Sequence, residues 1–467
     1  MHIAVTVVYL LAMLWIGVVT SKETHDIEDF FVASRRLPLW VNVNTIAATY
    51  IGAGATMGIA GMVYRSGIGG TAILVFQVGA MVLLALLLAE RLWETKAITL
   101  PDVVETLYDL RTREIVTVLR LISIAGVVGG QMLAMALIAQ VILGGASFQL
   151  ALIIMGGVII AYTVMGGLLA VALTDVVQMI LNALGVMVIL PWVGLKAVGG
   201  LAGLQKALPA ARFDFFSVGS SFLFLMFVFA VPGTFTAQEL WVRLFAAESP
   251  KKGKLALILA ALTVYLPYAI SVAVIGLVGA AMFPGVTSDK LIPVMLDKLA
   301  PGFLASVCLA SLLAAVMSCA DSVLLVAGSN VARDVYQRFM NPNASTQQVL
   351  LVSRVSVVGM GIIGMLLAAS ATGIIDLMTT VATPLAAVGP IILFGFYWKK
   401  ASPAGAQIAI ITAILLSIPT LFFKVKILNQ EPLVVTTVGS TIAVWLGSLL
   451  MPAKPKAQET AGASLPR

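Results

Sequence analysis

The sequence contains thirteen apolar runs, each long enough to cross a lipid bilayer as a helix, which needs about 20 residues. Strands of a membrane barrel alternate apolar and polar residues over about ten positions, whereas these runs are longer and continuously apolar. We therefore predict an all-α integral membrane protein with about 13 transmembrane helices. The runs lie near residues 3–20, 38–63, 68–90, 114–142, 148–165, 171–196, 219–242, 254–283, 302–330, 349–370, 374–398, 403–423 and 434–451.

Composition excludes several classes of protein. The 467 residues are 60% hydrophobic and only 10% charged, whereas a soluble chain is about 25% charged. Cys308 and Cys319 stand about 16 Å apart if their run is helical, too far for a disulfide. The sequence has only two histidines, and it shows no metal-ligand cluster, nucleophile motif or P-loop. We predict neither an enzyme nor a transporter driven directly by ATP.

The distribution of basic residues predicts the orientation. With the N-terminus outside, 19 of the 28 lysines and arginines fall in inside loops and eight in outside loops. Cytoplasmic loops are enriched in these residues, so we expect the N-terminus outside and the C-terminus inside a bacterial-type cytoplasmic (inner) membrane. This bias also explains the net charge of +7 without a nucleic-acid partner. The first run lacks the basic region of a signal peptide, so it is expected to be retained.

Two runs have interiors that favour a broken helix. The second contains Gly52 and Gly54 in mid-span, and the seventh contains Pro232 followed by Gly233. Broken helices free backbone groups that can bind ions or substrate, and breaks five spans apart fit an inverted repeat of five helices. The alternative is that these residues serve ordinary helix packing, because glycine and proline are common in membrane helices.

Seven motifs follow one another over nearly the whole chain, namely Asp29–Arg36, Ala48–Gly52, Gly58–Gly61, Gly166–Gln178, Gln238–Arg243, Ala315–Ser322 and Arg333–Tyr336. In their order and spacing they resemble the sodium:solute symporter family. The resemblance implies a LeuT-type inverted five-helix repeat with an extra N-terminal helix. It divides the single domain of residues 1–451 into an extra helix (1–20), repeat one (38–196), repeat two (219–398) and C-terminal helices (403–451). The polar composition of residues 452–467 separately predicts a disordered cytoplasmic tail.

The same resemblance implies a sodium site between the second and ninth spans. The ion would be bound by the backbone carbonyls of Ala48, Ile51 and Ala315 and by the hydroxyl of Ser318. Cys319 stands where the family usually has a second hydroxyl. Sodium prefers oxygen to a soft thiol, so the site binds sodium weakly, gains a water, or does not drive transport. Cys319 is alternatively a small packing residue.

Ionisable and polar residues within the spans are candidates for function. By resemblance, Asp175 lines the inward route for sodium; the alternative is an interfacial acid. Glu239 binds a cationic substrate group, carries a proton, or pairs with Arg243 four residues later. Polar residues also hold helices together, so each candidate contact has that alternative. The candidate substrate contacts are Thr49, Tyr50, Gln77, Gln131, Thr234, Thr236, Gln238 and Glu239.

These features predict a secondary active transporter that imports a small polar organic solute by alternating access, coupled to sodium. The solute is expected to be a carboxylate, an amino acid or a vitamin-like compound. The alternative is a proton-coupled or uncoupled carrier of the same fold, favoured by Cys319 and Glu239, with a transporter-like membrane sensor ranking lower. The expected partners are the solute and the lipid bilayer, with no nucleic acid and no obligatory protein partner evident.

Overall fold

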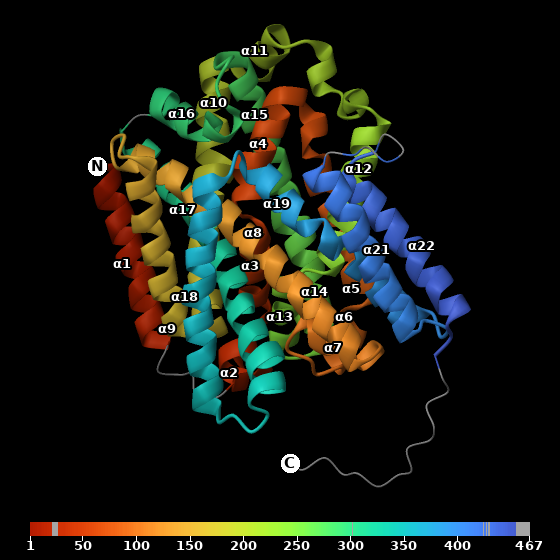
Figure 1. Ribbon diagram of the computed structural model, residues 1–467. Coiled ribbons are helices and arrows are strands. Elements are labelled where there is room, and N and C mark those ends of the chain that lie inside the picture. The colour runs from red at the N-terminus through yellow and green to blue at the C-terminus, as the bar shows by residue number, and fades with distance from the viewer. Residues whose placement is uncertain (21–26, 301, 424, 426, 428–429, 454–467) are drawn as a thin grey trace.

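A computed structural model describes residues 1–20, 27–300, 302–423, 425, 427 and 430–453, and these residues are nearly all helical (Figure 1). The predicted tail from residue 454 onward lies outside the described residues. The α-helices are α1 (His2–Thr20), α2 (Ile27–Val32), α3 (Leu39–Tyr50), α4 (Ile59–Ser66), α5 (Ala72–Leu87), α6 (Ala89–Glu94), α7 (Leu100–Leu107), α8 (Leu110–Ile142), α9 (Phe148–Asn182), α10 (Leu190–Val198), α11 (Gly200–Ala207), α12 (Ser220–Phe235), α13 (Gln238–Ala246), α14 (Pro250–Leu259), α15 (Leu266–Met282), α16 (Leu291–Leu299), α17 (Gly302–Ser329), α18 (Thr346–Ser370), α19 (Ile374–Ala382), α20 (Val388–Tyr397), α21 (Pro403–Phe422) and α22 (Pro432–Leu450).

Shorter helical turns connect or extend these helices. The 3-10 turns are η2 (Ala33–Arg35), η4 (Ile68–Thr71), η6 (Ala210–Phe213), η7 (Phe215–Val218), η9 (Ser288–Lys290) and η11 (Pro384–Ala387). The π-helical turns are η3 (Gly54–Gly58), η5 (Ala183–Ile189), η8 (Ala260–Tyr265) and η10 (Asn330–Met340).

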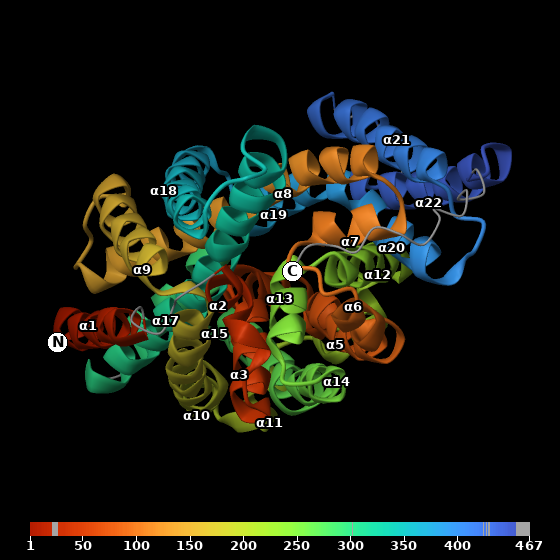
Figure 2. The ribbon, with the colours of Figure 1, turned by 90° about the horizontal axis from the view of Figure 1, so that it is seen from below.

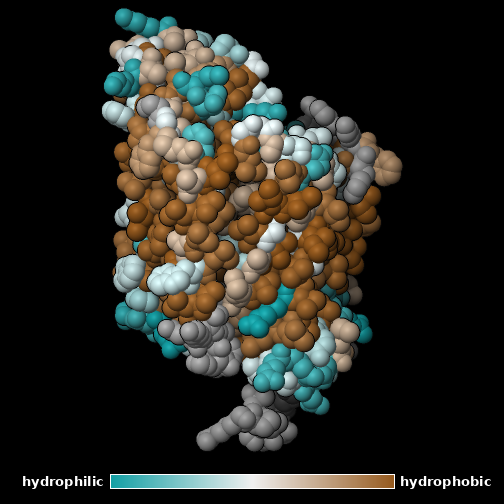
Figure 3. Space-filling view, turned by 90° about the vertical axis from the view of Figure 1, so that its left-hand side faces the viewer, coloured by the Kyte–Doolittle hydropathy of each residue, from teal (hydrophilic) through white to brown (hydrophobic). Residues whose placement is uncertain are grey.

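The described helices confirm the predicted spans. Ten are long and apolar enough to cross a membrane, and three bent helix pairs raise the number to 13. Each predicted run coincides with one of these spans. Large apolar side chains such as Trp15 and Leu415 are more than 60% exposed. Figure 3 shows that hydrophobic residues form a broad band at mid-height, with hydrophilic residues gathered at both ends. Such a surface fits a lipid environment rather than water.

The second span breaks where the glycines predict. Helix α3 ends at Tyr50, Ile51 leaves the helical conformation (φ −90°, ψ 70°), and the chain continues at 60° to α3 through η3 and α4. Gly52 lies against α17 so closely that an added Cβ would be 2.7 Å from the Cβ of Cys319. Real Cβ atoms do not approach this closely, so the break depends on a residue without a side chain.

The seventh span also bends, but later than Pro232 suggests. Helix α12 continues through Pro232 to Phe235 and meets α13 at 41°. The hydroxyl and the backbone N–H of Thr236 both lie 3.1 Å from the carbonyl oxygen of Pro232 and donate to it. This capping satisfies a carbonyl at the end of α12, and the chain turns only at Thr236 and Ala237.

Two further features of the backbone were not predicted. The eleventh span bends by 48° between Val381 and Pro384, where proline cannot extend the helical hydrogen bonding. Helix α9 contains two successive spans that reverse direction at Gly167, whose φ is +59°. An added Cβ at Gly167 would lie 2.9 Å from the ring of Phe30. Gly167 belongs to the Gly166–Gln178 motif, so this turn accounts for one of the motif's residues.

The broken spans lie inside the bundle (Figures 1 and 2). Helix α13 lies near its centre in Figure 2, whereas α21 and α22 pack together at its edge. Helices α10, α11 and α16 lie at one end in Figure 1, and α2, α6 and α7 lie at the other. We refer to these as the α11 end and the α7 end. The extra helix α1 packs against α9 and α17.

Candidate functional site

A cavity of about 200 Å³ lies between the broken spans. Its wall includes residues beside both breaks, such as Gly52 and Gly233, and is mostly apolar. Six of the predicted substrate contacts line it, namely Thr49, Tyr50, Gln77, Gln131, Thr236 and Glu239. The other two predicted contacts, Thr234 and Gln238, are fully buried just behind the wall.

The polar residues of the cavity are held by hydrogen bonds from behind. The Tyr265 hydroxyl donates to Gln77 Oε1 at 2.6 Å, and the Tyr50 hydroxyl donates to Thr234 Oγ1 at 3.3 Å. The two tyrosine rings lie 6.0 Å apart. Thr234 therefore supports a side chain of the wall, and the wall is organised before a ligand arrives.

Gln131 on α8 connects the break in the second span to α17. Its Oε1 accepts a hydrogen bond from the backbone N–H of Ala53 at 2.9 Å, and its Nε2 donates to Cys319 Sγ at 3.1 Å. The side-chain amide thus satisfies a backbone donor that the break leaves free. Cys319 packs closely against Gly52, accepts the hydrogen bond of Gln131 and lines the cavity.

Three of the atoms predicted to bind sodium lie together. The hydroxyl of Ser318 on α17 lies 3.1 Å from the carbonyl oxygen of Ala48 on α3 and 3.0 Å from that of Ala315. Ser318 is 1% exposed and Ala48 and Ala315 are each 2% exposed. Ile51 is the residue at which the helical pattern of α3 ends. This arrangement places hard oxygen atoms of two helices beside the break, away from solvent.

A buried polar network continues from this cluster toward the α7 end. Thr45 precedes Ala48 by one turn on α3, and Ser322 follows Ser318 by one turn on α17. Between them lies the fully buried Arg243 of α13, whose Nη2 donates to Ser322 Oγ at 2.5 Å and whose Nε donates to Thr45 Oγ1 at 3.1 Å.

Asp175 of α9 completes this network. Its Oδ2 lies 3.4 Å from Nη2 of Arg243 and also accepts a hydrogen bond from the hydroxyl of Thr45. Asp175 Oδ1 is buried without a hydrogen-bond partner among the described residues. Four helices, α3, α9, α13 and α17, thus meet at one ion pair. Asp175 is fully buried, and it pairs with an arginine as its alternative role in the sequence also allowed.

Glu239 pairs with a different arginine from the one considered in the sequence. Arg243 donates to the backbone carbonyl of Glu239 at 3.1 Å, while the Glu239 side chain forms an ion pair with Arg120 of α8. Arg120 and Glu239 both line the cavity. Arg120 was not predicted as a site residue, although a charge inside the apolar run 114–142 marks a candidate position.

Comparison with known proteins is consistent with this geometry. The model of the sodium:solute symporter family matches residues 30–413. The chain belongs to the sodium:solute symporter family. The symporter is 30% identical over 440 residues to the osmoregulated proline transporter OpuE of Bacillus subtilis, covering 86% of this chain and 85% of the relative. It is 26% identical to the sodium/pantothenate symporter of Escherichia coli, covering 97% of both chains.

A solved structure shows that the symporter has the predicted LeuT-type fold. The structure is described as the substrate-bound outward-open state of a Na+-coupled sialic acid symporter. It matches with a TM-score of 0.85 at 21% identity, covering 97% of this chain and 98% of the other. The predictions of the fold, of the family and of a transporter rather than an enzyme are confirmed by the family match and by this structure together.

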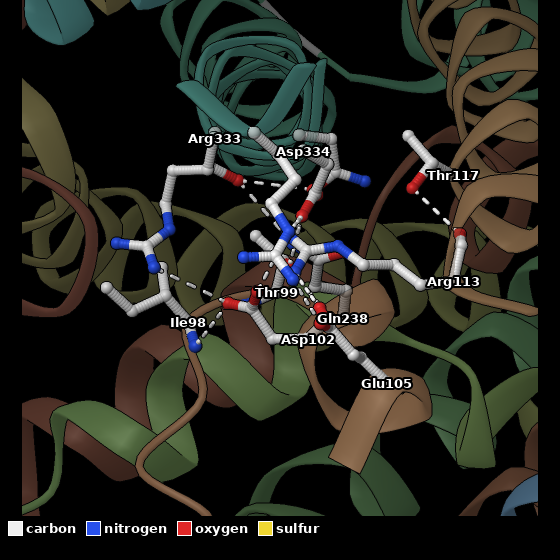
Figure 4. Close-up of polar contacts among 12 residues, drawn as sticks. Ile98, Thr99, Asp102, Glu105, Arg113, Thr117, Gln238, Arg333 and Asp334 are labelled. Atoms are coloured by element: carbon white, nitrogen blue, oxygen red, sulfur yellow. Dashed lines mark hydrogen bonds and ion pairs between the residues drawn. The ribbon is translucent and has the colours of Figure 1, made fainter. Parts of the chain in front are cut away.

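A second charged network closes the α7 end of the symporter (Figure 4). Arg113 near the start of α8 pairs with Asp334 of η10 at 2.5 Å, with Asp102 of α7 at 2.9 Å and with Glu105. Thr99 donates to Asp334 Oδ1 at 3.0 Å. This network joins α7, α8 and the turn that follows α17, and Asp334 belongs to the Arg333–Tyr336 motif.

Gln238 lies near this second network rather than in the cavity. Its Nε2 donates to Asn330 Oδ1 at 2.7 Å, which connects the first residue of α13 to the first residue of η10. Gln238 is fully buried. The contact indicates that this residue couples the second half of the broken seventh span to the ninth span, in addition to any role toward a substrate.

Proposed function

We propose that the symporter uses sodium to drive import of a small polar organic solute, and that Ala48, Ile51, Ala315 and Ser318 bind the ion. The observation that carries the proposal is the convergence of the Ser318 hydroxyl with the carbonyl oxygens of Ala48 and Ala315 at 3.1 and 3.0 Å. Oxygen ligands suit sodium, a hard cation. Without the ion the hydroxyl donates to these carbonyls; with sodium it would turn its lone pair to the ion.

Cys319 is the fifth position of the predicted sodium set, and we propose that it is a weak or outer ligand. Its sulfur accepts a hydrogen bond from Gln131, 3.1 Å away, and faces the break. A thiol adds little to the binding of a hard cation. Sodium would then rely on the three carbonyls, the Ser318 hydroxyl and water. This arrangement keeps sodium as the coupling ion with modest affinity.

Sodium binding would couple to the solute through the relative positions of α3 and α17. The site includes atoms of both helices, so the ion is bound best when they are close. The same part of α3 supplies Thr49 and Tyr50 to the cavity. If sodium binds best to one arrangement of α3, sodium binding raises the population of that arrangement and so the affinity for a solute that needs it. The bound solute raises the affinity for sodium by the same factor. Alternating access follows when the loaded protein closes one end and opens the other.

We propose that Asp175 belongs to the route by which sodium leaves toward the cytoplasm. The Asp175–Arg243 network lies one turn beyond the sodium cluster on the α7 side, and Asp175 Oδ1 is available to a passing cation.

The α7 end also carries Arg35, Arg91 and Arg338. By the positive-inside bias we assign the α7 end and the C-terminus to the cytoplasm and the N-terminus to the outside.

The solute would bind in the cavity against Thr49, Tyr50, Gln77, Gln131, Thr236 and Glu239, with Thr234 and Gln238 supporting them. The relatives are named for proline and pantothenate, small organic solutes with a carboxylate. We propose a solute of the same size class for this chain.

The test is sodium-dependent uptake into proteoliposomes containing the purified full chain. Candidate carboxylates, amino acids and vitamins are supplied with an inward sodium gradient, or with potassium at the same ionic strength. Uptake that needs sodium, and that needs a higher sodium concentration in Ser318→Ala, supports the proposal. Uptake that follows a proton gradient and ignores sodium would instead establish the proton-coupled alternative, which the thiol of Cys319 favours.

A further inference from the structure

The cavity wall carries two charged side chains among the residues that the structure describes, and they have opposite signs. Arg120 of α8 and Glu239 of α13 form an ion pair, with side-chain exposures of 6% and 15%. The rest of the wall consists of apolar residues and uncharged polar residues held by hydrogen bonds. The wall therefore has no net charge, although it contains both a strong anion-binding group and a strong cation-binding group.

A pair of this kind is costly to keep for stability alone. Removing two ions from water costs several kcal/mol for each ion, and apolar residues in their place often stabilise a protein equally well. Ionisable groups within a membrane domain usually mark substrate or ion pathways. The pair faces the cavity rather than a packed helix interface, so a ligand can reach both charges.

We propose that Arg120 and Glu239 select a zwitterionic solute, and this inference rests on the transport function proposed above. The carboxylate of the solute binds the guanidinium of Arg120, and its ammonium or quaternary nitrogen binds the carboxylate of Glu239. The resident ion pair opens, and each member exchanges its partner for the matching group of the solute. The apolar body of the solute lies against Met226, Phe229 and Val127 of the same wall. Amino acids and betaines have this chemistry.

Charge balance explains why other solutes are rejected. A monoanion on Arg120 leaves Glu239 as an uncompensated charge in a mostly apolar cavity, and a monocation on Glu239 leaves Arg120 in the same state. A neutral solute leaves the pair intact and gains no charge-assisted hydrogen bonds. Only a solute with both charges replaces both interactions. Glu239 thus lowers the affinity for anions that Arg120 alone would bind.

The experiment measures sodium-dependent thermal stabilisation of the purified full chain by three charge classes of matched skeleton. Common amino acids and glycine betaine are the zwitterions. The amides of the amino acids and choline are the cations, and the N-acetyl amino acids and pantothenate are the anions. Each compound is titrated in sodium chloride and in potassium chloride. We expect a zwitterion to give the tightest sodium-dependent binding; an anion or a cation as the tightest ligand overturns the inference.

Single substitutions then separate selection from support of the fold. Glu239→Gln and Arg120→Gln should each lower the affinity for the zwitterion by about 10- to 100-fold, which corresponds to the loss of one charge-assisted hydrogen bond. Glu239→Gln should gain affinity for the N-acetyl analogue, and Arg120→Gln for the amide. Equal weakening of all three classes, or unchanged zwitterion binding, contradicts the inference. Glu114→Gln and Arg111→Gln, exposed positions on α8, are the matched controls.

The double variant Arg120→Gln/Glu239→Gln guards against misfolding, because it leaves no unpaired charge. It should lose zwitterion affinity by about 100-fold or more, and retained affinity again overturns the inference.

The proposed sodium coupling and the proposed charge selection are contradicted by different results. Zwitterion binding that is equal in sodium and potassium contradicts sodium coupling but keeps the charge selection. Sodium stabilisation without any zwitterion binding contradicts the charge selection and keeps the sodium site.

Discussion

Arg243 on α13 and Asp175 on α9 form an ion pair that is fully buried. Their Nη2 and Oδ2 atoms lie 3.4 Å apart, and each side chain is 0% accessible to solvent. The pair is the point at which four helices of the symporter meet, one turn from the Ser318 cluster. Its location suggests that movement of α13 relative to α9 must break it. Its disruption should therefore affect both stability and the opening of the α7 end.

Asp175→Ala should lower the stability of the symporter by about 3–5 kcal/mol, because it leaves the guanidinium of Arg243 buried without its carboxylate. Sodium activation of uptake should weaken at the same time. Thermal unfolding and the sodium dependence of uptake check the two effects. The double variant Asp175→Asn/Arg243→Gln should recover most of the stability; sodium activation that stays at the wild-type level in Asp175→Ala would argue against a role in sodium release.

Ser318→Ala should raise the sodium concentration for half-maximal uptake by about 10-fold, since one charge-assisted ligand is lost. The measurement is initial uptake against sodium concentration at constant ionic strength. Ser311→Ala is the matched control, because Ser311 is a buried serine two turns earlier on α17 that donates to the backbone carbonyls of Leu181 and Val307. A sodium response that is equal in the two variants would remove Ser318 from the site.

Cys319→Ser should lower the half-maximal sodium concentration by about 3- to 10-fold, because a hydroxyl is a better ligand for sodium than a thiol. Cys319→Ala should stay close to the wild type if the thiol contributes little. The same uptake titration distinguishes them. A large loss of sodium affinity in Cys319→Ala, together with no gain in Cys319→Ser, would show that the sulfur itself has an essential role.

Gly52→Ala should destabilise the symporter by about 1–3 kcal/mol, the usual cost of overpacking. Its Cβ would lie 2.7 Å from Cys319 Cβ and 2.8 Å from Gln131 Nε2. Gly79→Ala on α5 is the control, because an added Cβ there meets nothing within 4 Å. Thermal unfolding of both variants in detergent checks the difference, and equal stability would mean that the break can move away from α17.

The spans could be predicted because the length and polarity of an apolar run are local properties. The break at Gly52 and the common helix face of Ala315 and Ser318 are likewise local, and the structure places Ser318 against Ala48 as the resemblance implied. The bend between Val381 and Pro384 also has a local signal, because proline cannot extend the helical hydrogen bonding.

The ion pairs could not be predicted from spacing alone. Glu239 lies four residues before Arg243 on one helix, yet its side chain pairs with Arg120, 119 positions earlier in the sequence. Arg243 turns instead toward Asp175 and Ser322. Which of these partners a charge meets depends on how α8, α9, α13 and α17 pack, and packing between distant helices leaves no periodic signal in one sequence.

Helix α1 lies outside the two repeats but is joined to α17 by side-chain contacts. The Tyr9 hydroxyl lies 3.6 Å from the sulfur of Met317, next to Ser318, and His2 Nδ1 lies 2.9 Å from the Ser306 hydroxyl of the same helix. Met1 is 63% exposed. A fluorophore at residue 1 should therefore follow any tilt of α17 as sodium binds, while leaving the cavity and its charged pair unmodified.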